Sequence, residues 1–235
     1  MRRVYRELFN LEGFESFEVS YKKSNLFIKS CKNARFEVFK YLKKLIDELE
    51  IYIEKRKDFL SSLTPIKQDK KAPKIAQAMI EAARIAGVGP MAAVAGAVAE
   101  FIGKNLLKEC NECIVENGGD VFLKLNKQAT IGVFTTNPYF KDKLAINLSC
   151  TGLGCGICSS SSKIGPSLSL GRADLAMIVD KDCAKADALA TKTANLIKEE
   201  SDIDKAIEFA KSKNIIGCLF IKDKKLGIWG NLKVV

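Results

Sequence analysis

The stretch CIVENGGDVFLKL, residues 113–125, decides the fold class of this chain. Apolar side chains recur at a strand-like period on both sides of Asn117-Gly118-Gly119, and that tripeptide is typical of a tight hairpin turn. The stretch therefore predicts two antiparallel strands, at 113–116 and 121–125. Helices are expected before them, over 73–85 and from Pro90 to about Cys110, because proline suits a first helical position. Helices followed by antiparallel strands indicate an α+β fold, built from layers of antiparallel sheet and helices.

Further elements are expected on both sides of this hairpin. An extended segment over 17–30 precedes a long amphipathic helix over 34–58, whose apolar residues recur at gaps of four and three. The later elements are expected as strands over 130–135, 144–149 and 173–179, helices over 182–198 and 203–212, and a closing hairpin over 216–221 and 226–229. The glycine- and serine-rich passage 151–171 is expected to be a loop with at most one short strand. The length predicts a single domain over 1–235, within which 1–150 and 151–235 are candidate lobes.

The composition excludes several kinds of chemistry. The 235 residues include 38 Lys and Arg, 28 Asp and Glu and no histidine, which gives a formal net charge of +10. Without histidine, Ser-His-Asp catalysis, Cys-His catalysis and an HExxH zinc site are ruled out. The positive charge favours anionic partners such as phosphate-bearing cofactors. Because the lysines are scattered and do not alternate with aromatic residues, dedicated nucleic-acid binding is not expected.

A membrane span is not expected either. The nearly uncharged stretch 85–103 is interrupted by Pro90 and carries Glu100, so it is better explained as a buried helix. The first six residues, MRRVYR, lead into no apolar signal region, and this favours a cytoplasmic protein.

Eight cysteines include two pairs with CxxC spacing, Cys110 and Cys113 in CNEC, and Cys155 and Cys158 in CGIC. Two such pairs together can hold zinc or an iron–sulfur cluster. The CGIC pair alone can be a redox or sulfur-handling pair, because CxxC geometry can lower a thiol pKa. Cysteine used as a small apolar residue is the third alternative. Cys155 and Cys158 are the candidate reactive thiols, while Cys218, in an expected strand, should be inert.

Three stretches have the composition of a nucleotide or phosphate site. In GVGPM, Gly89 directly precedes a helix N-terminus, where backbone N–H groups can bind phosphate, although a helix break with close packing is the alternative. The glycines of ENGGD allow a backbone to approach a ligand, and its carboxylates can bind hydroxyls or a cation; an ordinary turn is the alternative. The serines after CGIC, with Lys163, suit a phosphate, and a flexible loop is the alternative. The candidate cofactor-binding residues are Gly89, Asn117, Gly118, Gly119, Asp120, Ser159, Ser160 and Ser161.

The stretch ADALATKTAN, residues 186–195, contains a candidate metal site. Asp187, Thr191 and Asn195 follow one another at intervals of four and share one face of the expected helix. A carboxylate and a hydroxyl one turn apart suit Mg²⁺, which prefers oxygen ligands and retains waters for substrate phosphates. Asp187 and Thr191 are therefore the candidate metal ligands, with a solvated polar face as the alternative.

These motifs resemble those of a known family. ADALAT resembles the metal-binding helix motif of the ApbE family, flavin transferases that move FMN from FAD onto protein threonines. The GGD segment after an apolar strand is similar to that family's glycine pair. A closer resemblance is to a UPF-class family of conserved proteins, related to ApbE and common in archaea. It rests on AGVGPMAAVAGAVAE (86–100), VENGGD (115–120), TGLGCGICSSS (151–161), GPSLSLGRAD (165–174) and ADALAT, in this order.

The resemblance implies an ApbE-like fold with a cleft for FAD or a related nucleotide, for Mg²⁺ and, where transfer takes place, for a protein substrate. It implies that Asp187 and Thr191 bind the metal and that Gly118 and Gly119 correspond to the family's glycine pair. The chain lacks the family's TDGAFD-like and histidine-containing segments. A nucleotide binder that retains or has lost transferase activity, a cysteine-based protein of sulfur amino-acid metabolism, and a noncatalytic interaction protein stay open, as does the oligomeric state. ENGGD, the CGIC–serine passage and ADALAT are expected to meet in one cleft, because a binding pocket gathers polar groups from different elements.

Overall fold

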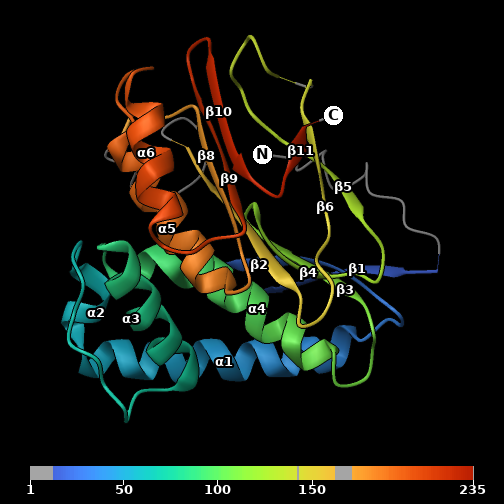
Figure 1. Ribbon diagram of the computed structural model, residues 1–235. Coiled ribbons are helices and arrows are strands. Elements are labelled where there is room, and N and C mark those ends of the chain that lie inside the picture. The colour runs from blue at the N-terminus through green and yellow to red at the C-terminus, as the bar shows by residue number, and fades with distance from the viewer. Residues whose placement is uncertain (1–12, 142, 162–170, 235) are drawn as a thin grey trace.

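The computed structural model describes residues 13–141, 143–161 and 171–234 (Figure 1). The chain begins with strands β1 (Glu15–Tyr21) and β2 (Ser24–Ser30). The helices α1 (Arg35–Lys55), α2 (Lys57–Ser61), α3 (Lys74–Ala86) and α4 (Val94–Leu106) follow, and the short 3-10 helix η2 (Pro90–Ala93) leads into α4. The remaining elements are β3 (Cys113–Asn117), β4 (Asp120–Lys124), β5 (Ala129–Gly132), β6 (Ala145–Leu148), β7 (Cys155–Ser160), β8 (Leu175–Asp180), α5 (Cys183–Leu196), α6 (Asp202–Lys211), β9 (Gly217–Lys222), β10 (Lys225–Gly230) and β11 (Lys233–Val234).

The strands form two antiparallel sheets. The larger has eight strands in the order β1-β2-β3-β4-β7-β8-β9-β10, and the smaller has three in the order β11-β6-β5. β2 pairs with β3, Ser30 lying opposite Cys113, although four helices separate them in the chain. β4 pairs with β7, Leu123 lying opposite Cys155. The predicted α+β fold, in antiparallel sheets and helices, is thus confirmed.

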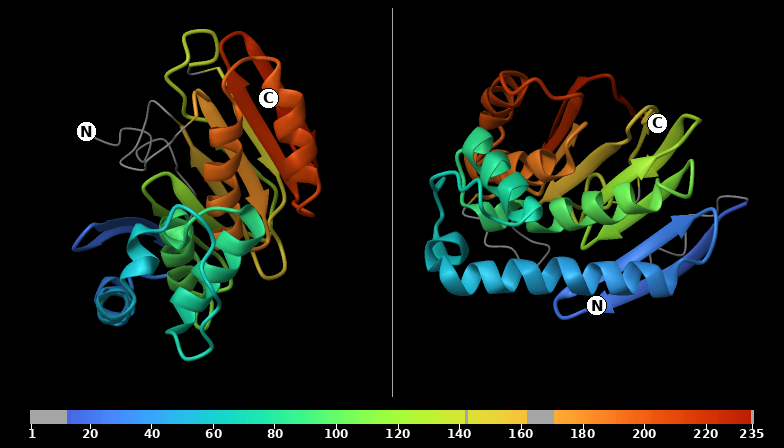
Figure 2. Two further views of the ribbon diagram at one scale, coloured as in Figure 1. Left: turned by 90° about the vertical axis from the view of Figure 1, so that its left-hand side faces the viewer. Right: turned by 90° about the horizontal axis from the view of Figure 1, so that it is seen from below.

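Each face of the large sheet is covered by a different layer (Figures 1 and 2). Ile28, Phe122 and Cys158 belong to one apolar core, which they share with buried residues of the helices. Leu123 and Ile157 belong to a second core, which contains Ile146 of the small sheet. Every residue of β8 is buried, as expected of a central strand with a layer on each side. The core facing the helices is the one that carries the candidate site.

The predicted elements are present, with three local differences. The passage 151–171, expected as a loop with at most one short strand, contains the six-residue strand β7, whose place between β4 and β8 in the centre of the large sheet was not predicted. The helix expected over 34–58 is divided at Arg56 into α1 and α2. The helix expected from Pro90 begins as η2, and the α-helix proper starts at Val94.

Both sheets draw strands from the two candidate lobes. The large sheet takes β1 to β4 from before residue 150 and β7 to β10 from after it, and β11 pairs with β6 across the same boundary. Within the described residues, no single helix is both long and apolar enough to cross a membrane; α3 and η2–α4 meet that test only as a pair bent by 104°.

Candidate functional site

Asp187 lies where α4 and α5 cross. Its Oδ2 accepts a hydrogen bond from the backbone N–H of Gly96, at 2.9 Å, in the first turn of α4. The helices touch here, because a Cβ added to Gly96 would lie 2.4 Å from the Cys183 carbonyl oxygen. The Asp187 carboxyl is buried, and burial raises its pKa well above the ordinary value, with the neighbouring Asp120 carboxylate adding to the effect. The site thus contains an acid that is costly to ionise without a compensating charge.

Asp120, the first residue of β4, lies beside Asp187. Its Oδ1 accepts the backbone N–H of Ser159 at 3.1 Å, while the nearby Cys158 thiol donates to the Cys183 carbonyl at 3.4 Å. Burial raises the pKa of Asp120 to about 7, with a further contribution from the Glu116 carboxylate. Among the described residues, no lysine or arginine forms an ion pair with either Asp120 or Asp187. Two buried carboxyl groups therefore lie close together without a cation from the described part of the chain.

Two cysteine thiols, Cys158 and Cys183, lie close to these acids. The Sγ atoms of Cys158 and Cys183 are 3.5 Å apart, and the Cys183 thiol donates to the Val121 carbonyl at 3.7 Å. Burial raises the pKa of Cys183 to about 11 and that of Cys158 well above its ordinary value. Both groups are therefore protonated near neutral pH, and a protonated thiol is a hydrogen-bond donor and a poor nucleophile.

The ENGGD hairpin turn ends with Asp120, one of these two acids. Gly118 and Gly119 have φ values of 70° and 105°, in the left-handed region that favours glycine. The Gly119 N–H donates to Glu116 Oε1 at 2.7 Å, and Asn117 Nδ2 donates to the Ala95 carbonyl at 3.2 Å. Because side chains alternate along a strand, Asn117 faces the helices together with Asp120, opposite it, while Glu116 lies on the other face. Asp120 therefore faces the helices, whereas Glu116 faces the other side of the sheet.

The serines of β7 divide in the same way. Ser160 alternates with Cys158 on the helix-facing side, and its buried hydroxyl has no hydrogen-bond partner among the described residues. Ser159 faces the other side, where its Oγ would lie 3.9 Å from a Cβ added to Gly119. Ser161, just after the strand, is also buried. Ser162 and Lys163 lie outside the described residues.

Thr191 and Gly89 occupy different surroundings. Thr191 is half-buried and lies one turn after Asp187 on α5, as the helical spacing predicts. Gly89, by contrast, packs against the segment after α2, because a Cβ there would lie 1.8 Å from the Ser62 carbonyl oxygen. Close packing therefore accounts for that glycine.

The ENGGD turn, β7 and the ADALAT stretch of α5 lie near one another, because Asp120 accepts the N–H of Ser159 and its carboxylate lies close enough to raise the pKa of Asp187. That the three segments line one cleft stays a prediction. Gly96, Glu100 and Cys183 also belong to this region, although the sequence motifs did not point to them. Glu100 has a signal in the sequence, since it is the only acidic residue in the apolar stretch 85–103.

The cysteines do not pair as their CxxC spacing suggested. Cys110 forms a disulfide with Cys31, and Cys155 forms one with Cys150. Cys113 and Cys158 are free and buried, so neither CxxC pair forms a two-thiol unit, and Cys155 and Cys158 lie on a buried strand where a loop was expected. The described residues contain no cluster of three or more Cys, Asp or Glu side chains suited to a metal ion.

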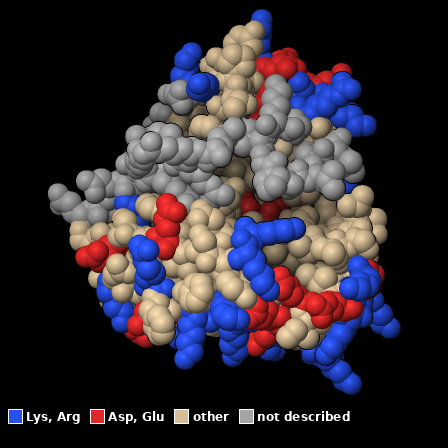
Figure 3. Space-filling model, turned by 180° about the vertical axis from the view of Figure 1, so that it is seen from behind, with Lys and Arg blue, Asp and Glu red and all other residues tan. Residues whose placement is uncertain are grey.

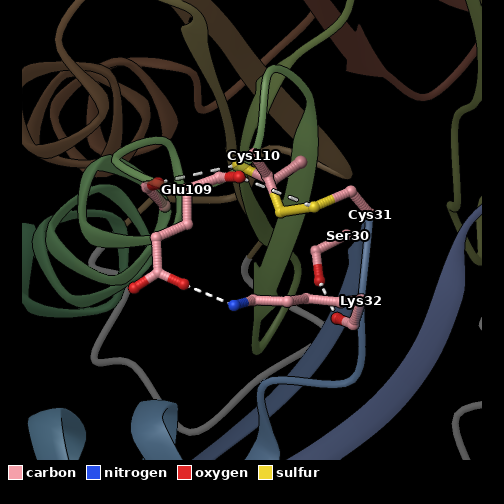
Figure 4. Close-up of a disulfide and its surroundings, with 7 residues drawn as sticks. Ser30, Cys31, Lys32, Glu109 and Cys110 are labelled. Carbon is pink, nitrogen blue, oxygen red and sulfur yellow. Dashed lines mark hydrogen bonds and ion pairs between the residues drawn. A yellow bond between two sulfur atoms is a disulfide. The ribbon is translucent and has the colours of Figure 1, made fainter.

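The Cys31–Cys110 disulfide joins the end of β2 to the segment between α4 and β3 (Figure 4). Beside it, Lys32 forms an ion pair with Glu109, and the Ser30 hydroxyl donates to the Lys32 carbonyl at 2.6 Å. This disulfide therefore joins the two ends of the segment that contains α1 to α4.

On the face shown in Figure 3, outside the grey atoms, Lys and Arg are interspersed with Asp and Glu. A surface hollow beside Phe36 and Phe39, at the start of α1, includes none of the candidate residues.

Comparisons with known proteins agree with the fold. A model of the family described as AbpE bacteria matches residues 6–215. A UPF0280 protein of Methanobrevibacter smithii is 38% identical over 200 residues, which cover 82% of this chain and 84% of that protein. A UPF0280 protein of Methanocaldococcus jannaschii is 39% identical over 191 residues, covering 79% and 78%.

Solved structures of flavin transferases have a similar fold. The flavinyl transferase ApbE of Pseudomonas stutzeri, in its apo form, superposes with a TM-score of 0.61 at 11% identity, covering 94% of each chain. The flavin transferase ApbE of Vibrio cholerae gives a TM-score of 0.56 at 12% identity, covering 92% of this chain and 97% of that one. At these identities the likeness establishes the fold alone.

Proposed function

This chain belongs to the AbpE bacteria family and to the UPF0280 proteins, and on that premise we propose that it binds a flavin nucleotide, FAD or a close relative, together with Mg²⁺. The binding site lies where the ENGGD turn, β7 and α5 meet. The observation that carries the proposal is the pair of buried carboxyl groups, Asp120 and Asp187, which lack a cationic partner among the described residues.

The donor set fits a magnesium ion bound together with phosphate. Mg²⁺ is commonly held by one or two carboxylates plus the phosphates of a substrate, and it keeps several waters. Asp187 and Thr191 supply a carboxylate and a hydroxyl from one face of α5, and Asp120 supplies a second carboxylate. A bound cation would favour the ionised form of both acids, which burial alone disfavours.

The neighbouring residues suit a nucleotide. The buried Ser160 hydroxyl, which no described residue bonds, can donate to a phosphate oxygen. Gly118 and Gly119 present backbone without side chains at the turn, so a ligand can approach closely. Ser161, buried just after the strand, adds a second hydroxyl, while Ser159 contributes its backbone N–H, which binds Asp120.

The test is thermal unfolding with FAD, FMN or ATP, each with and without Mg²⁺. A ligand present at about 100 times its dissociation constant stabilises a protein by roughly 2.7 kcal/mol. We expect FAD to raise the melting temperature, and Mg²⁺ to add to the shift. Asp187→Asn should remove the magnesium-dependent part. Asp204→Asn, which alters an exposed acid paired with Lys225, serves as the control and should leave it intact.

The absence of any shift at millimolar FAD and Mg²⁺ would contradict the proposal. Transferase activity is a separate question, because binding alone does not imply it. Transfer of FMN from FAD releases AMP, so magnesium-dependent AMP release in the presence of an acceptor protein distinguishes a transferase from a binder.

A further inference from the structure

Helices α4 and α5 exchange hydrogen bonds through one carboxylate each. Glu100, on α4, accepts the N–H of Cys183 at 2.9 Å and that of Ala184 at 3.4 Å, both on its Oε2. Asp187, on α5, accepts the N–H of Gly96 in return. Each helix therefore supplies an acceptor to the first turn of the other, where N–H groups have no partner within their own helix.

The first turn of α5 depends on Glu100. The N–H groups of Cys183 and Ala184 bond to that side chain, and the N–H of Lys185 bonds to the Asp182 side chain at 2.8 Å. The bonds from Cys183 and Ala184 are buried, whereas that from Lys185 is exposed, and leaving a buried donor without an acceptor costs about 1–3 kcal/mol. Glu100 is itself 5% exposed. The charge of Glu100 is balanced by the ammonium group of Lys104, which binds its other oxygen.

The exchange fixes the position of Asp187. Cys183, held by Glu100, lies one helical turn before Asp187, and Gly96, held by Asp187, lies one turn before Glu100. The space between them is filled, since a Cβ at Gly96 would also lie 2.8 Å from the Asp187 Cβ. A shift of the first turn of α5 therefore moves the Asp187 carboxylate.

We propose that Glu100 is a positioning residue, whose hydrogen bonds to the first turn of α5 hold the Asp187 carboxylate at the cation site. That Asp187 binds a cation rests on the proposed function. That Glu100 holds Asp187 in its hydrogen bond with the Gly96 N–H does not depend on it.

The experiment measures two properties of Glu100→Ala and Glu100→Gln. Glutamine keeps the length of the side chain and an acceptor oxygen, while alanine removes the acceptor. We expect alanine to weaken Mn²⁺ binding, measured by electron paramagnetic resonance titration, by about 10-fold to 100-fold, as is usual for residues that orient a metal ligand. Glutamine should retain most of the affinity. Amide hydrogen exchange at Gly96 should accelerate in the alanine variant and remain slow in the glutamine variant.

A control separates position from general stability. Leu42, on α1, is fully buried, so Leu42→Ala opens a cavity away from α5 and should lower the stability of the whole protein. It should leave the Mn²⁺ affinity unchanged, and the Gly96 amide should exchange no faster than the lowered global stability accounts for. If Glu100→Ala does not fold, Glu100→Asp, which keeps the charge but shortens the reach, replaces it with the same expectation. Wild-type Mn²⁺ affinity and wild-type Gly96 exchange in the folded variant would overturn the inference. If the wild-type protein binds no Mn²⁺, the proposed function fails, and Gly96 exchange alone still tests the positioning.

Discussion

Glu100, Asp120 and Asp187 are buried near one another, but they differ in whether another group balances their negative charge. Glu100 accepts two backbone N–H groups and pairs with Lys104, so its negative charge is balanced within the protein. Asp120 and Asp187 accept backbone N–H groups as well, but no lysine or arginine from the described residues pairs with them. Burial raises the pKa of all three carboxyl groups. The lack of compensation at Asp120 and Asp187 is what distinguishes a candidate cation site from a structural acid.

This difference predicts how stability depends on pH. The pKa of Asp120 is 3.8 in an unfolded chain and about 7 in the fold, so the folded protein binds more protons between these values. The contribution of this group to stability is therefore present at low pH and is lost as pH rises through about 7. Without divalent cation, wild-type protein should be less stable to urea at about pH 8 than at about pH 5, and Asp120→Asn should lose less stability over the same range.

The neighbouring acids share in this effect, because the pKa values of Asp187 and Glu100 are raised too. Asp120→Asn should therefore reduce the loss and not abolish it, and Mg²⁺ should restore stability to the wild-type protein at the higher pH. Asp204→Asn is the matched surface control. An Asp120→Asn variant with the wild-type pH dependence would show that this carboxyl group titrates normally.

The sequence predicted site residues where local spacing determines the chemistry. Asp187 and Thr191 fall one turn apart on α5 as expected, and Asp120 lies at the end of the expected turn. Glu100 and Gly96 escaped prediction because their partners lie on another helix, a tertiary relation that helical spacing does not contain. Glu116, at the other end of the same turn, lies on the opposite face from Asp120 because side chains alternate along a strand, and its proximity in sequence does not show this.

At the scale of elements, the crossing of α4 and α5 depends on Gly96. Alanine normally stabilises a helix relative to glycine by about 0.5–1 kcal/mol. At Gly96, however, the added Cβ would lie 2.4 Å from the Cys183 carbonyl oxygen, so the helices would have to separate. We expect Gly96→Ala to destabilise the protein by about 1–3 kcal/mol in urea unfolding.

Gly132→Ala is the control for this substitution. It lies in β5, where nothing is within 4 Å of the added Cβ and φ is not in the left-handed region. It should have a small effect on stability. If Gly96→Ala were neutral or stabilising, the two helices would not be in the close contact described above.

The strand β7 shows why the sequence alone did not reveal a strand at the centre of the large sheet. Its sequence CGICSS has glycine and serine, which are typical of loops, and only one strongly apolar residue, Ile157. This segment nevertheless forms a strand, because β4 and β8 supply hydrogen-bond partners on its two sides. Gly156 is required there, since a Cβ would lie 2.4 Å from the Cys183 Cα. Sequence alone contains neither the neighbouring strands nor the helix that passes over this glycine.

At the scale of the whole molecule, the large sheet joins the two candidate lobes. Because β7 forms its hydrogen bonds with β4 on one side and β8 on the other, residues 151–235 alone would expose one edge of β7. That fragment would also lose α4, which supplies Glu100 to α5. We expect neither 1–150 nor 151–235, expressed separately, to show a cooperative unfolding transition.

Circular dichroism during thermal unfolding and the dispersion of amide proton shifts measure this. The full chain should unfold cooperatively, and mixing the two fragments should restore some of its signal. A fragment with native-like dispersion by itself would show that one candidate lobe folds independently.

The pairing of β2 with β3 has a consequence for how fast the native state is reached. Helices α1 to α4 lie between the two strands in the chain, and a pairing between distant segments lowers the folding rate because the chain must first close a long loop. The Cys31–Cys110 disulfide, with a sequence separation of 79, joins the two ends of that same loop next to Ser30 and Cys113. Once oxidised, the chain retains this closure when it is denatured, so β2 and β3 begin their search for register already side by side. The oxidation state of one pair of cysteines thereby determines the kinetic accessibility of the fold, as well as its stability.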